Sequence, residues 1–359
     1  MTKPMRYKGR GSISNATGRF EPQSSHAEDD GWGSLDAELP ARNTEILVDS
    51  SRSIISYNDS PDIPFDRSLN PYRGCEHGCS YCFARPTHAY LGFSAGLDFE
   101  SRIVVKPDAA NLLKQALKKR GYRCAPLAIG TNTDPYQPLE RQQRIMRQVL
   151  EVLAECRHPV SIVTKSALLE RDIDLLAAMA EQGLAEVYLS ITTLDRQLAR
   201  TLEPRAAAPQ RRLETVGKLR NADIPCGVMV APVIPALNDH ELEAIAKAAH
   251  SAGAQNLGYI LLRLPLEVAE LFEEWLRQHY PLKAEHVLNL VKDSRGGRIY
   301  DSTFHRRLAG QGVYADMLRQ RFRLVTKKLG MDKPLPALRC DLFRRPVDDD
   351  KQMSFDFFI

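Results

Sequence analysis

The sequence predicts an α/β fold, an incomplete (β/α)6 barrel that is preceded by an arm and followed by helices. Two observations support this fold: six short β-like apolar runs occur along the chain, and helical patterns of apolar residues separate them. Such alternation is typical of parallel βα units with right-handed crossovers. The chain of 359 residues, 43% hydrophobic and 26% charged, has room for one such domain plus additions, because barrels commonly reach about 250 residues as one unit.

The expected elements follow one another in a regular order. The first expected strand leads into the segment near residue 70. A helix is then expected from Asp108, a candidate N-cap, to Gly121. Asn238 with Glu241 three residues later has the pattern of a capping box and marks another helix start. The other expected strands are 126–130, 160–163, 187–191, 227–230 and 257–262, with helical spacing at 145–153, 173–180 and 213–219 between them.

The two ends of the chain differ from the barrel core, which we expect to span residues 46–265. Residues 1–45 mix Gly, Ser, Asn, Asp and Arg with little apolar periodicity, so we expect a flexible, disordered arm. Residues 266–345 form a basic extension with helical patterns at 266–279, 284–292 and 314–329, which we expect to close the open side of the barrel. Residues 346–359 form an acidic and aromatic tail.

Charge is unevenly distributed along the chain. Residues 292–345 carry 14 Lys or Arg against 5 Asp, a net charge of +9, whereas the whole chain carries only +4 and the remainder is therefore −5. This segment suits a polyanion such as a nucleic acid, and it equally suits an ordinary solvated surface. No run of about 18 apolar residues occurs, and no signal-peptide pattern opens the chain, so we expect a cytoplasmic protein with no membrane partner.

Three closely spaced cysteines, Cys75, Cys79 and Cys82, are the strongest chemical signal. Three thiolates from one loop hold a [4Fe–4S] cluster by three of its four irons and leave the fourth iron open for another ligand. The loop follows the first strand, and sites in parallel βα folds gather at the carboxyl ends of the strands. The spacing therefore predicts a metal-cluster site at that end of the barrel.

Other uses of these cysteines remain open at this point. A structural zinc site needs a fourth ligand, for which His77 and Cys340 are the candidates. A disulfide framework is disfavoured because seven cysteines is an odd number. The scattered cysteines are expected to be small buried hydrophobic residues: Cys124, Cys156, Cys226 and Cys340.

The spacing C-x3-C-x2-C, with Tyr81 before the last cysteine, resembles the cluster loop of the radical S-adenosylmethionine (SAM) superfamily. The stretch 68–264 further resembles its DNA-repair-photolyase-like branch, the relatives of spore photoproduct lyase. The residues that carry this second resemblance are 70–75, 85–88, 131–140 and the segments around Ser190 and Glu203. The superfamily core is a six-fold βα partial barrel with its cluster after the first strand, which agrees with the fold expected above.

The resemblance implies a [4Fe–4S] cluster whose open iron is chelated by the amino and carboxylate groups of SAM. One electron, supplied by a reductase of the flavodoxin or ferredoxin type, would cleave SAM to methionine and a 5′-deoxyadenosyl radical that abstracts a substrate hydrogen. On this resemblance the metal ligands are Cys75, Cys79 and Cys82, and the SAM contacts are Tyr81, Thr133, Lys165, Ser190 and Arg205.

The candidates for the substrate side of the site are His88, Tyr90 and Glu140, which lie in loops or helix starts next to the cluster and SAM region. Packing for Tyr90 and a surface position for His88 are the alternatives. Spore photoproduct lyase uses a hydrogen-donor cysteine near the end of its second strand, where residues 131–133 of this chain are Thr, Asn and Thr. Spore photoproduct repair itself is therefore not expected.

We favour a nucleic acid as the substrate, and a peptide or a metabolite stays open because the fold does not determine the substrate. The alternative from another functional class is a zinc-stapled nucleic-acid-binding module without radical chemistry. In the tail, Gln352, Phe355, Phe357 and Phe358 resemble the peptide Q-x-x-L-x-L-F, by which bacterial repair proteins dock on the DNA sliding clamp. The alternative for the tail is that it folds back on its own domain.

Overall fold

A seven-stranded sheet of order β10-β9-β8-β7-β6-β3-β2 forms the centre of the computed structural model, which describes residues 9–21 and 43–347. Six neighbouring strands are parallel, and β2 (Ile55–Tyr57) pairs antiparallel with β3 at one edge. The parallel strands are β3 (Arg67–Leu69), β6 (Leu127–Ile129), β7 (Val160–Thr164), β8 (Ala185–Ser190), β9 (Cys226–Val233) and β10 (Asn256–Leu261). These are the six expected strands, and the predicted partial barrel is confirmed.

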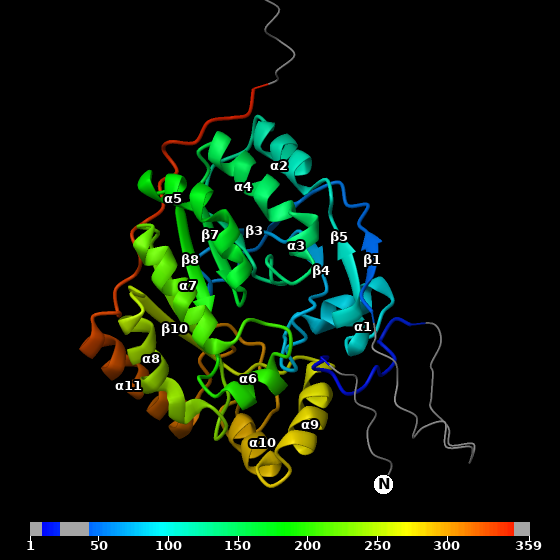
Figure 1. The fold of residues 1–359 in the computed structure, drawn as a ribbon. Coiled ribbons are helices and arrows are strands. Elements are labelled where there is room, and N and C mark those ends of the chain that lie inside the picture. Colours follow the sequence, from blue (N-terminus) through cyan, green and yellow to red (C-terminus); the bar gives the residue numbers. More distant parts are fainter. Residues whose placement is uncertain (1–8, 22–42, 348–359) are drawn as a thin grey trace, which may run out of the picture.

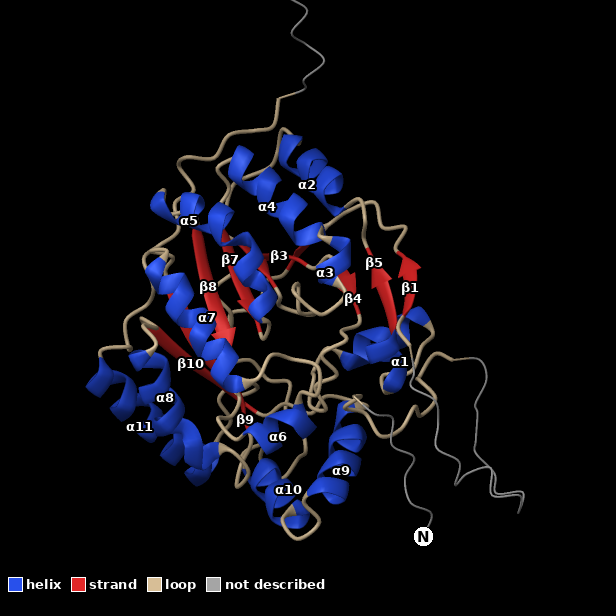
Figure 2. Cartoon of the chain, viewed as in Figure 1, coloured by secondary structure: helices blue, strands red, loops and turns tan. Residues whose placement is uncertain are grey.

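Helices connect successive strands and lie along the outer side of the curved sheet (Figures 1 and 2). They pack on it through fully buried side chains such as Val149 and Leu176, which meet Ile162 and Val187 of the sheet in one hydrophobic cluster. The connecting helices are α2 (Ala109–Lys118), α4 (Ile145–Glu155), α5 (Ile173–Glu181), α7 (Pro209–Asn221) and α8 (Leu242–Ser251). Shorter helices are η1 (Arg85–Leu91), α1 (Leu97–Ser101), α3 (Glu140–Gln143), η2 (Ala167–Asp172), α6 (Arg196–Leu202) and η3 (Asp239–Glu241).

A second, three-stranded sheet lies beside the barrel, at the right of Figure 1. It consists of β1 (Glu45–Val48), β5 (Arg102–Val105) and β4 (Tyr72–Arg73), in the order β1-β5-β4. Strand β4 leads directly into the cysteine loop, so this sheet fixes one end of that loop. No sequence pattern predicts this sheet, because strands of two to four residues are too short to show an alternating pattern.

The described part of the N-terminal region, residues 9–21, is packed against the protein. The backbone N–H groups of Gly11 and Ser12 donate to the carboxylate of Glu100, at 2.9 and 2.8 Å. A side chain at Gly11 would collide with the carbonyl oxygen of Gly78, so only glycine permits this close approach. The expected disordered arm over residues 1–45 is therefore wrong for 9–21, while 1–8 and 22–42 lie outside the described residues.

Asn238 and Glu241 do not form the capping box that their spacing predicts. The Asn238 side chain accepts from the backbone N–H of Ile234 at 2.6 Å and donates to the carbonyl oxygen of Thr192 at 2.7 Å. Glu241 accepts from the hydroxyl of Thr193 at 2.8 Å. Both side chains tie together the loops that follow β8 and β9, because these loops lie within reach and offer buried donors and acceptors.

The three expected C-terminal helices are present as α9 (Val268–His279), α10 (Ala284–Asp293) and α11 (Gly312–Leu329). Helices α9 and α10 pack around the buried Trp275, whose indole N–H donates to the carbonyl oxygen of Thr201 at 2.9 Å. Helix α11 packs on α8, and its Phe322 ring lies 4.6 Å from the ring of Tyr259 in β10. Among the described residues, no helix has both the length and the apolar character to cross a membrane.

A loop between α10 and α11, rather than a helix, bridges the two edges of the main sheet. On one edge, the backbone N–H of Leu261 in β10 donates to the carbonyl oxygen of Leu308 at 2.9 Å. On the other, the guanidinium of Arg307 donates to Asp62 in the turn between β2 and β3 at 2.6 Å. The C-terminal extension thus spans the open side of the barrel as expected, through the loop between α10 and α11.

An extended segment, residues 331–345, then crosses the amino ends of the strands (Figure 1). The backbone N–H groups of Arg339 and Arg344 donate to the carbonyl oxygens of Gly183 and Cys156, at 2.9 and 2.8 Å. The ring of Phe343 packs on those of Tyr122 and His158. This segment holds the end of the barrel opposite the cysteine loop.

His158 makes the free energy of unfolding depend on pH. It is buried, and burial lowers its pKa from 6.5 to about 4. The unfolded chain therefore binds a proton that the folded chain does not, and stability falls as pH decreases from 6.5 to about 4, by about 1.4 kcal/mol per pH unit. We expect His158→Gln to reduce this slope by that amount in urea titrations at several pH values; an unchanged slope would contradict the assignment.

Candidate functional site

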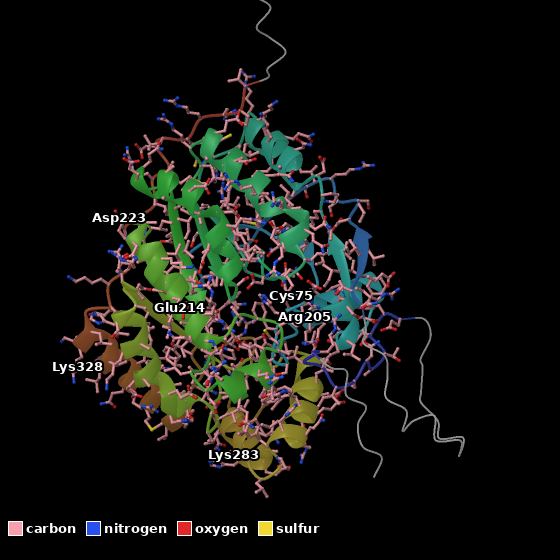
Figure 3. All side chains as sticks on the ribbon, in the orientation of Figure 1. Cys75, Arg205, Glu214, Asp223, Lys283 and Lys328 are labelled. Atoms are coloured by element: carbon pink, nitrogen blue, oxygen red, sulfur yellow. The ribbon has the colours of Figure 1, made fainter. Side chains whose placement is uncertain are left out.

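The cysteine loop lies between β4 and η1, near the middle of the molecule, where Figure 3 labels Cys75. Cys75 and Cys79 are buried, Cys82 is partly exposed, and none of them is in a disulfide. Successive turns place the three close together: Gly78 donates its N–H to the carbonyl oxygen of Cys75 at 3.3 Å, and Cys82 donates to that of Cys79 at 3.2 Å. The loop therefore presents three thiols from one compact piece of backbone.

The thiols are in surroundings that disfavour the free thiolate. Burial raises the pKa of Cys75 well above its ordinary value, raises that of Cys79 to about 12, and raises that of Cys82 as well. A bound cationic cluster displaces these protons and supplies the missing positive charge, so the donor set fits a [4Fe–4S] cluster.

The three thiols do not converge on a point where one metal ion would bind. Within 9–21 and 43–347, no group of three or more His, Cys, Asp or Glu side chains is arranged to hold one metal ion. In a cube each thiolate binds a different iron, so three thiols need not converge on one point. The structure thus offers the zinc alternative no such site among these residues.

A fully buried ion pair, Arg85 with Glu100, holds the loop from behind. The Arg85 guanidinium also donates to the carbonyl oxygen of Cys79 at 3.0 and 2.9 Å. Glu100 in turn accepts from Gly11 and Ser12 of the N-terminal segment. One pair therefore fixes the middle cysteine and the segment that covers the loop.

Glycines and an amide side chain shape the rest of the loop. Gly74 and Gly78 have φ of +80° and +65°, and a Cβ at Gly78 would lie 2.6 Å from a carboxylate oxygen of Glu100. The Gln137 side chain accepts from the N–H of Glu76 at 2.8 Å and donates to the carbonyl oxygen of Gly74 at 3.3 Å. Gln137 comes from the loop after β6, so the second parallel strand positions the cysteine loop.

Asp134, in the same loop after β6, connects the cysteine loop to β7. Its carboxylate lies 3.4 Å from Nδ1 of His77 and accepts from the Thr164 hydroxyl at 2.6 Å and the Lys165 N–H at 2.7 Å. Burial acts to raise the pKa of Asp134, but the neighbouring His77 ring and these hydrogen bonds outweigh it and hold the pKa at about 2. Asp134 is thus an ionised anchor that our sequence analysis did not single out.

Three of the predicted SAM contacts lie together at the ends of β7 and β8. The Lys165 ammonium donates to the Ser190 hydroxyl at 3.0 Å and lies 5.8 Å from the centroid of the Tyr81 ring. The Lys165 charge also lowers the pKa of the Cys79 thiol, against the larger effect of burial. A cation, a hydroxyl and an aromatic ring next to the cysteine loop are groups that suit a carboxylate, a ribose and a flat ring.

A second buried ion pair, Glu203 with Arg212, supports this group. Glu203 accepts from the hydroxyls of Tyr81 and Thr192, and Arg212 donates to the carbonyl oxygen of Ser190 at 2.7 Å. Burial acts to raise the pKa of Glu203, but the charges of Arg212 and Lys165 lower it by more, so that the pKa is about 2. The pairing has no periodic or motif signature, so the sequence did not indicate Arg212.

The other two predicted SAM contacts differ from this group. Arg205 lies against the cysteine loop, where it donates to Glu76 at 3.0 Å, and Figure 3 labels it beside Cys75. Its charge is therefore already paired. Thr133 is buried and its hydroxyl donates to the carbonyl oxygen of Tyr72 at 2.9 Å, so it stabilises the fold here rather than presenting its hydroxyl to a ligand.

The two aromatic candidates for the substrate side have opposite surroundings. His88 is fully buried between Phe93 and Phe99, its Nε2 lies 3.0 Å from the carbonyl oxygen of Arg102, and burial lowers its pKa to about 4. It packs behind the loop, so the substrate-side prediction for His88 is not supported. Tyr90 is 71% exposed and stacks on Phe20; its substrate-side role stays a prediction.

Glu140 is not on the substrate side. It is fully buried and accepts from the Tyr72 hydroxyl, from Arg171 at 2.7 Å, and from the N–H groups of Ile145 and Met146 at 3.1 and 3.0 Å. Four donors occupy its two oxygens, and burial raises its pKa. The prediction was wrong because the partners of the Glu140 side chain all lie inside the fold, where Glu140, the first residue of α3, accepts from the first N–H groups of α4.

Comparisons with known proteins agree with this site. The family model of the radical SAM superfamily matches residues 69–249. An uncharacterized protein of Mycobacterium tuberculosis is 36% identical over 297 residues, 81% of this chain and 83% of the relative. An uncharacterized protein of Methanocaldococcus jannaschii is 27% identical over 221 residues, 62% of this chain and 79% of the relative.

Among solved structures, a variant of spore photoproduct lyase has a TM-score of 0.57 at 18% identity and covers 79% of both chains. The same lyase complexed with dinucleoside spore photoproduct has a TM-score of 0.56 at 17% identity, also over 79% of both chains. At these identities the likeness shows a shared fold.

The surroundings of Glu140 predict a role in stability. Glu140→Ala leaves the guanidinium of Arg171 and two N–H groups without this partner, and breaking a buried ion pair costs about 3 kcal/mol. We expect that loss in urea unfolding, with the iron content of the reconstituted protein retained. Glu151→Ala, which removes an exposed carboxylate 3.3 Å from Arg147, is the control and should cost less than about 1 kcal/mol. Equal effects of the two substitutions would contradict this role.

Proposed function

Because the chain belongs to the radical SAM superfamily, whose enzymes use a [4Fe–4S] cluster and SAM, we propose that it holds the cluster through Cys75, Cys79 and Cys82 and uses SAM to abstract hydrogen from a nucleic acid. The observation that carries the proposal is the position of the three loop thiols, two of them buried, beside Tyr81, Lys165 and Ser190. Cluster ligands and SAM contacts must adjoin, since SAM binds the open iron.

When bound, the two cofactors supply one-electron cleavage of SAM to methionine and a 5′-deoxyadenosyl radical. The residues of the chain would bind these cofactors and orient them. Lys165 and Ser190 offer an ammonium and a hydroxyl to the carboxylate and ribose of SAM. Arg85 fixes the backbone of Cys79, and the segment around Gly11 covers the loop and limits the access of water to it.

Two features support a nucleic acid as the substrate. The segments 70–75, 85–88 and 131–140 resemble the DNA-repair-photolyase-like branch, and the fold resembles that of spore photoproduct lyase complexed with dinucleoside spore photoproduct. Spore photoproduct repair is outside the proposal, because residues 131–133 offer no cysteine. Cys124 lies elsewhere, next to Cys340 on the segment that crosses the amino ends of the strands.

Two partners belong to the same proposal. A one-electron reductase of the flavodoxin or ferredoxin type would reduce the cluster, as in any enzyme of this chemistry. A sliding clamp would bind the tail through Gln352, Phe355, Phe357 and Phe358. These tail residues lie outside the described residues, so the clamp contact rests on the sequence pattern alone.

Anaerobic reconstitution with iron and sulfide tests the cofactor assignment. We expect a brown protein with about four irons per chain that converts SAM to 5′-deoxyadenosine when reduced with dithionite. Replacing Cys75, Cys79 or Cys82 individually by Ala should abolish cluster retention, since each thiolate holds one iron of the cube. Cys156→Ala and Cys124→Ala are the matched controls and should retain the iron.

Two outcomes would overturn the assignment. A single variant of the loop cysteines that still binds about four irons would mean that the ligand set is wrong. A colourless protein with stoichiometric zinc would favour the zinc-stapled module instead.

The basic C-terminal segment can be tested for nucleic-acid binding by charge reversal. Arg307 and Arg321 are unsuitable, because they pair with Asp62 and Glu243 at 2.6 and 2.7 Å. Arg306 and Arg323 form no ion pair within 4 Å in the described part of the chain. If both contact phosphates, Arg306→Glu and Arg323→Glu each lower the slope of log affinity against log salt by about 1 in anisotropy titrations with DNA. Unchanged affinity at low salt would remove this surface from the proposal.

A further inference from the structure

Arg263 connects the last parallel strand to the cysteine loop. It lies two residues beyond β10, between Leu262 and Leu264, which are 1% and 0% exposed. Side chains alternate along an extended segment, so Arg263 is directed away from the core that its neighbours enter. Its guanidinium carbon lies 4.8 Å from the ring centroid of Phe83, the residue directly after Cys82.

The charge of Arg263 has no acidic partner in the part of the chain that the structure describes. No carboxylate lies within 4 Å of its guanidinium among the described residues, and its Nε is buried without a hydrogen-bond acceptor. Contact with the Phe83 ring satisfies one face of the guanidinium but none of its N–H donors. These donors point outward in the plane of the guanidinium and need an acceptor lone pair, which the ring does not offer. Donors on the edge of the guanidinium therefore remain available for an anion.

A second guanidinium adds to the positive charge at this position. Arg295 is 2% exposed and donates to the carbonyl oxygens of Leu261 and Leu262, at 3.3 and 2.8 Å. It also donates to two carbonyls of the closing loop, residues 294–311 between α10 and α11. Burial and the nearby Arg263 charge lower the pKa of Arg295 to about 10. Asp301 is the acidic group that offsets Arg295, and it also faces Arg306, so positive charge is in excess.

The ligand that best complements this arrangement is a phosphate beside a flat ring. A guanidinium is a planar fork that binds phosphate oxygens in pairs, and it keeps its charge at all physiological pH values. The ring of Phe83 is 42% exposed, so part of it stays open for contact with a base or sugar. The carboxylate of SAM has similar chemistry, but its expected partners, Lys165 and Ser190, come from the ends of β7 and β8.

We propose that Arg263, stacked on Phe83, binds a phosphate of the nucleic-acid substrate beside the cysteine loop. The inference rests on the proposed function and deepens it by assigning the substrate an entry side, at the end of β10. Arg295 is a positioning residue. It holds the backbone carbonyls of Leu261 and Leu262 and so fixes the backbone position from which the Arg263 side chain extends. Arg263 lies outside residues 69–249, which the family model matches.

The test measures binding of a fluorescent single-stranded DNA of about twelve nucleotides, within the span of one single-strand site, to the reconstituted holoenzyme at several salt concentrations. For Arg263→Ala we expect about ten-fold weaker binding at low salt, and a slope of log affinity against log salt that is smaller by about 1. Arg263→Lys should keep the slope and lose part of the affinity, because it keeps the charge but not the fork. Lys283→Ala, which removes an exposed cation at the periphery in Figure 3, is the control and should bind like the unmodified enzyme.

Two further readouts separate the alternatives. SAM affinity of Arg263→Ala should match that of the unmodified holoenzyme; a loss of SAM affinity without a loss of DNA affinity would assign Arg263 to the SAM carboxylate and overturn the proposal. A polyglutamate peptide should bind weakly and independently of Arg263. Equal binding of peptide and DNA, with equal losses in Arg263→Ala, would indicate an acidic peptide instead.

The design also separates this inference from the proposed function. Failure of the unmodified holoenzyme to cleave SAM would contradict the radical chemistry. The DNA titration of Arg263→Ala would still show whether Arg263 contacts a phosphate. If Arg263→Ala loses its iron or its circular dichroism signal, Arg263→Lys decides: affinity equal to that of the unmodified enzyme would overturn the fork-phosphate contact, and reduced affinity at an unchanged salt slope would support it.

Discussion

The buried ion pair between Arg85 and Glu100 is the constraint on which the site depends. Two charges removed from water are costly unless every donor and acceptor is paired. Here the unpaired positions of the arginine are taken up by the carbonyl oxygens of Cys79, Ala95 and Gly96, and the carboxylate is completed by N–H groups of residues 9–21. The full set of partners is present only when the cysteine loop, α1 with the turn before it, and the N-terminal segment are all in place, so the pair links the shape of the loop to the completion of the fold.

The same logic extends to the strand ends. Asp134 and Glu203 are both held ionised against the effect of burial, the first by His77 and hydrogen bonds from β7, the second by Arg212 and Lys165. Lys165 thus lies between two fixed anions, with its N–H on Asp134 and its charge near Glu203. A side chain held at both its backbone and its ammonium has little freedom to move, which suits a group that must meet a carboxylate in one orientation.

The parts of the fold that the sequence predicted are those with a repeated or spaced pattern. Five apolar runs separated by helical patterns, with one strand expected before the cysteine loop, predicted the parallel sheet. The spacing of Cys75, Cys79 and Cys82 predicted the loop. The second sheet has strands too short for periodicity, and His88 and Glu140 have polar side chains whose partners come from distant segments. Arg85 with Glu100 and Glu203 with Arg212 are likewise pairings set by tertiary contact, so no local pattern indicates them.

The basic C-terminal extension shows why formal charge is a poor guide to a binding surface. Part of its charge is used by the fold itself: Arg295 on backbone carbonyls, Arg307 on Asp62, and Arg321 on Glu243. These arginines fasten the closing loop and α11 to the barrel, and a charge that is already paired contributes little to an external field. Beside the cysteine loop, the guanidinium of Arg263, two residues beyond β10, lies against the ring of Phe83 with no carboxylate within 4 Å among the described residues. A local, uncompensated guanidinium beside the site is thus a stronger argument for an anionic substrate than the net charge of the whole extension.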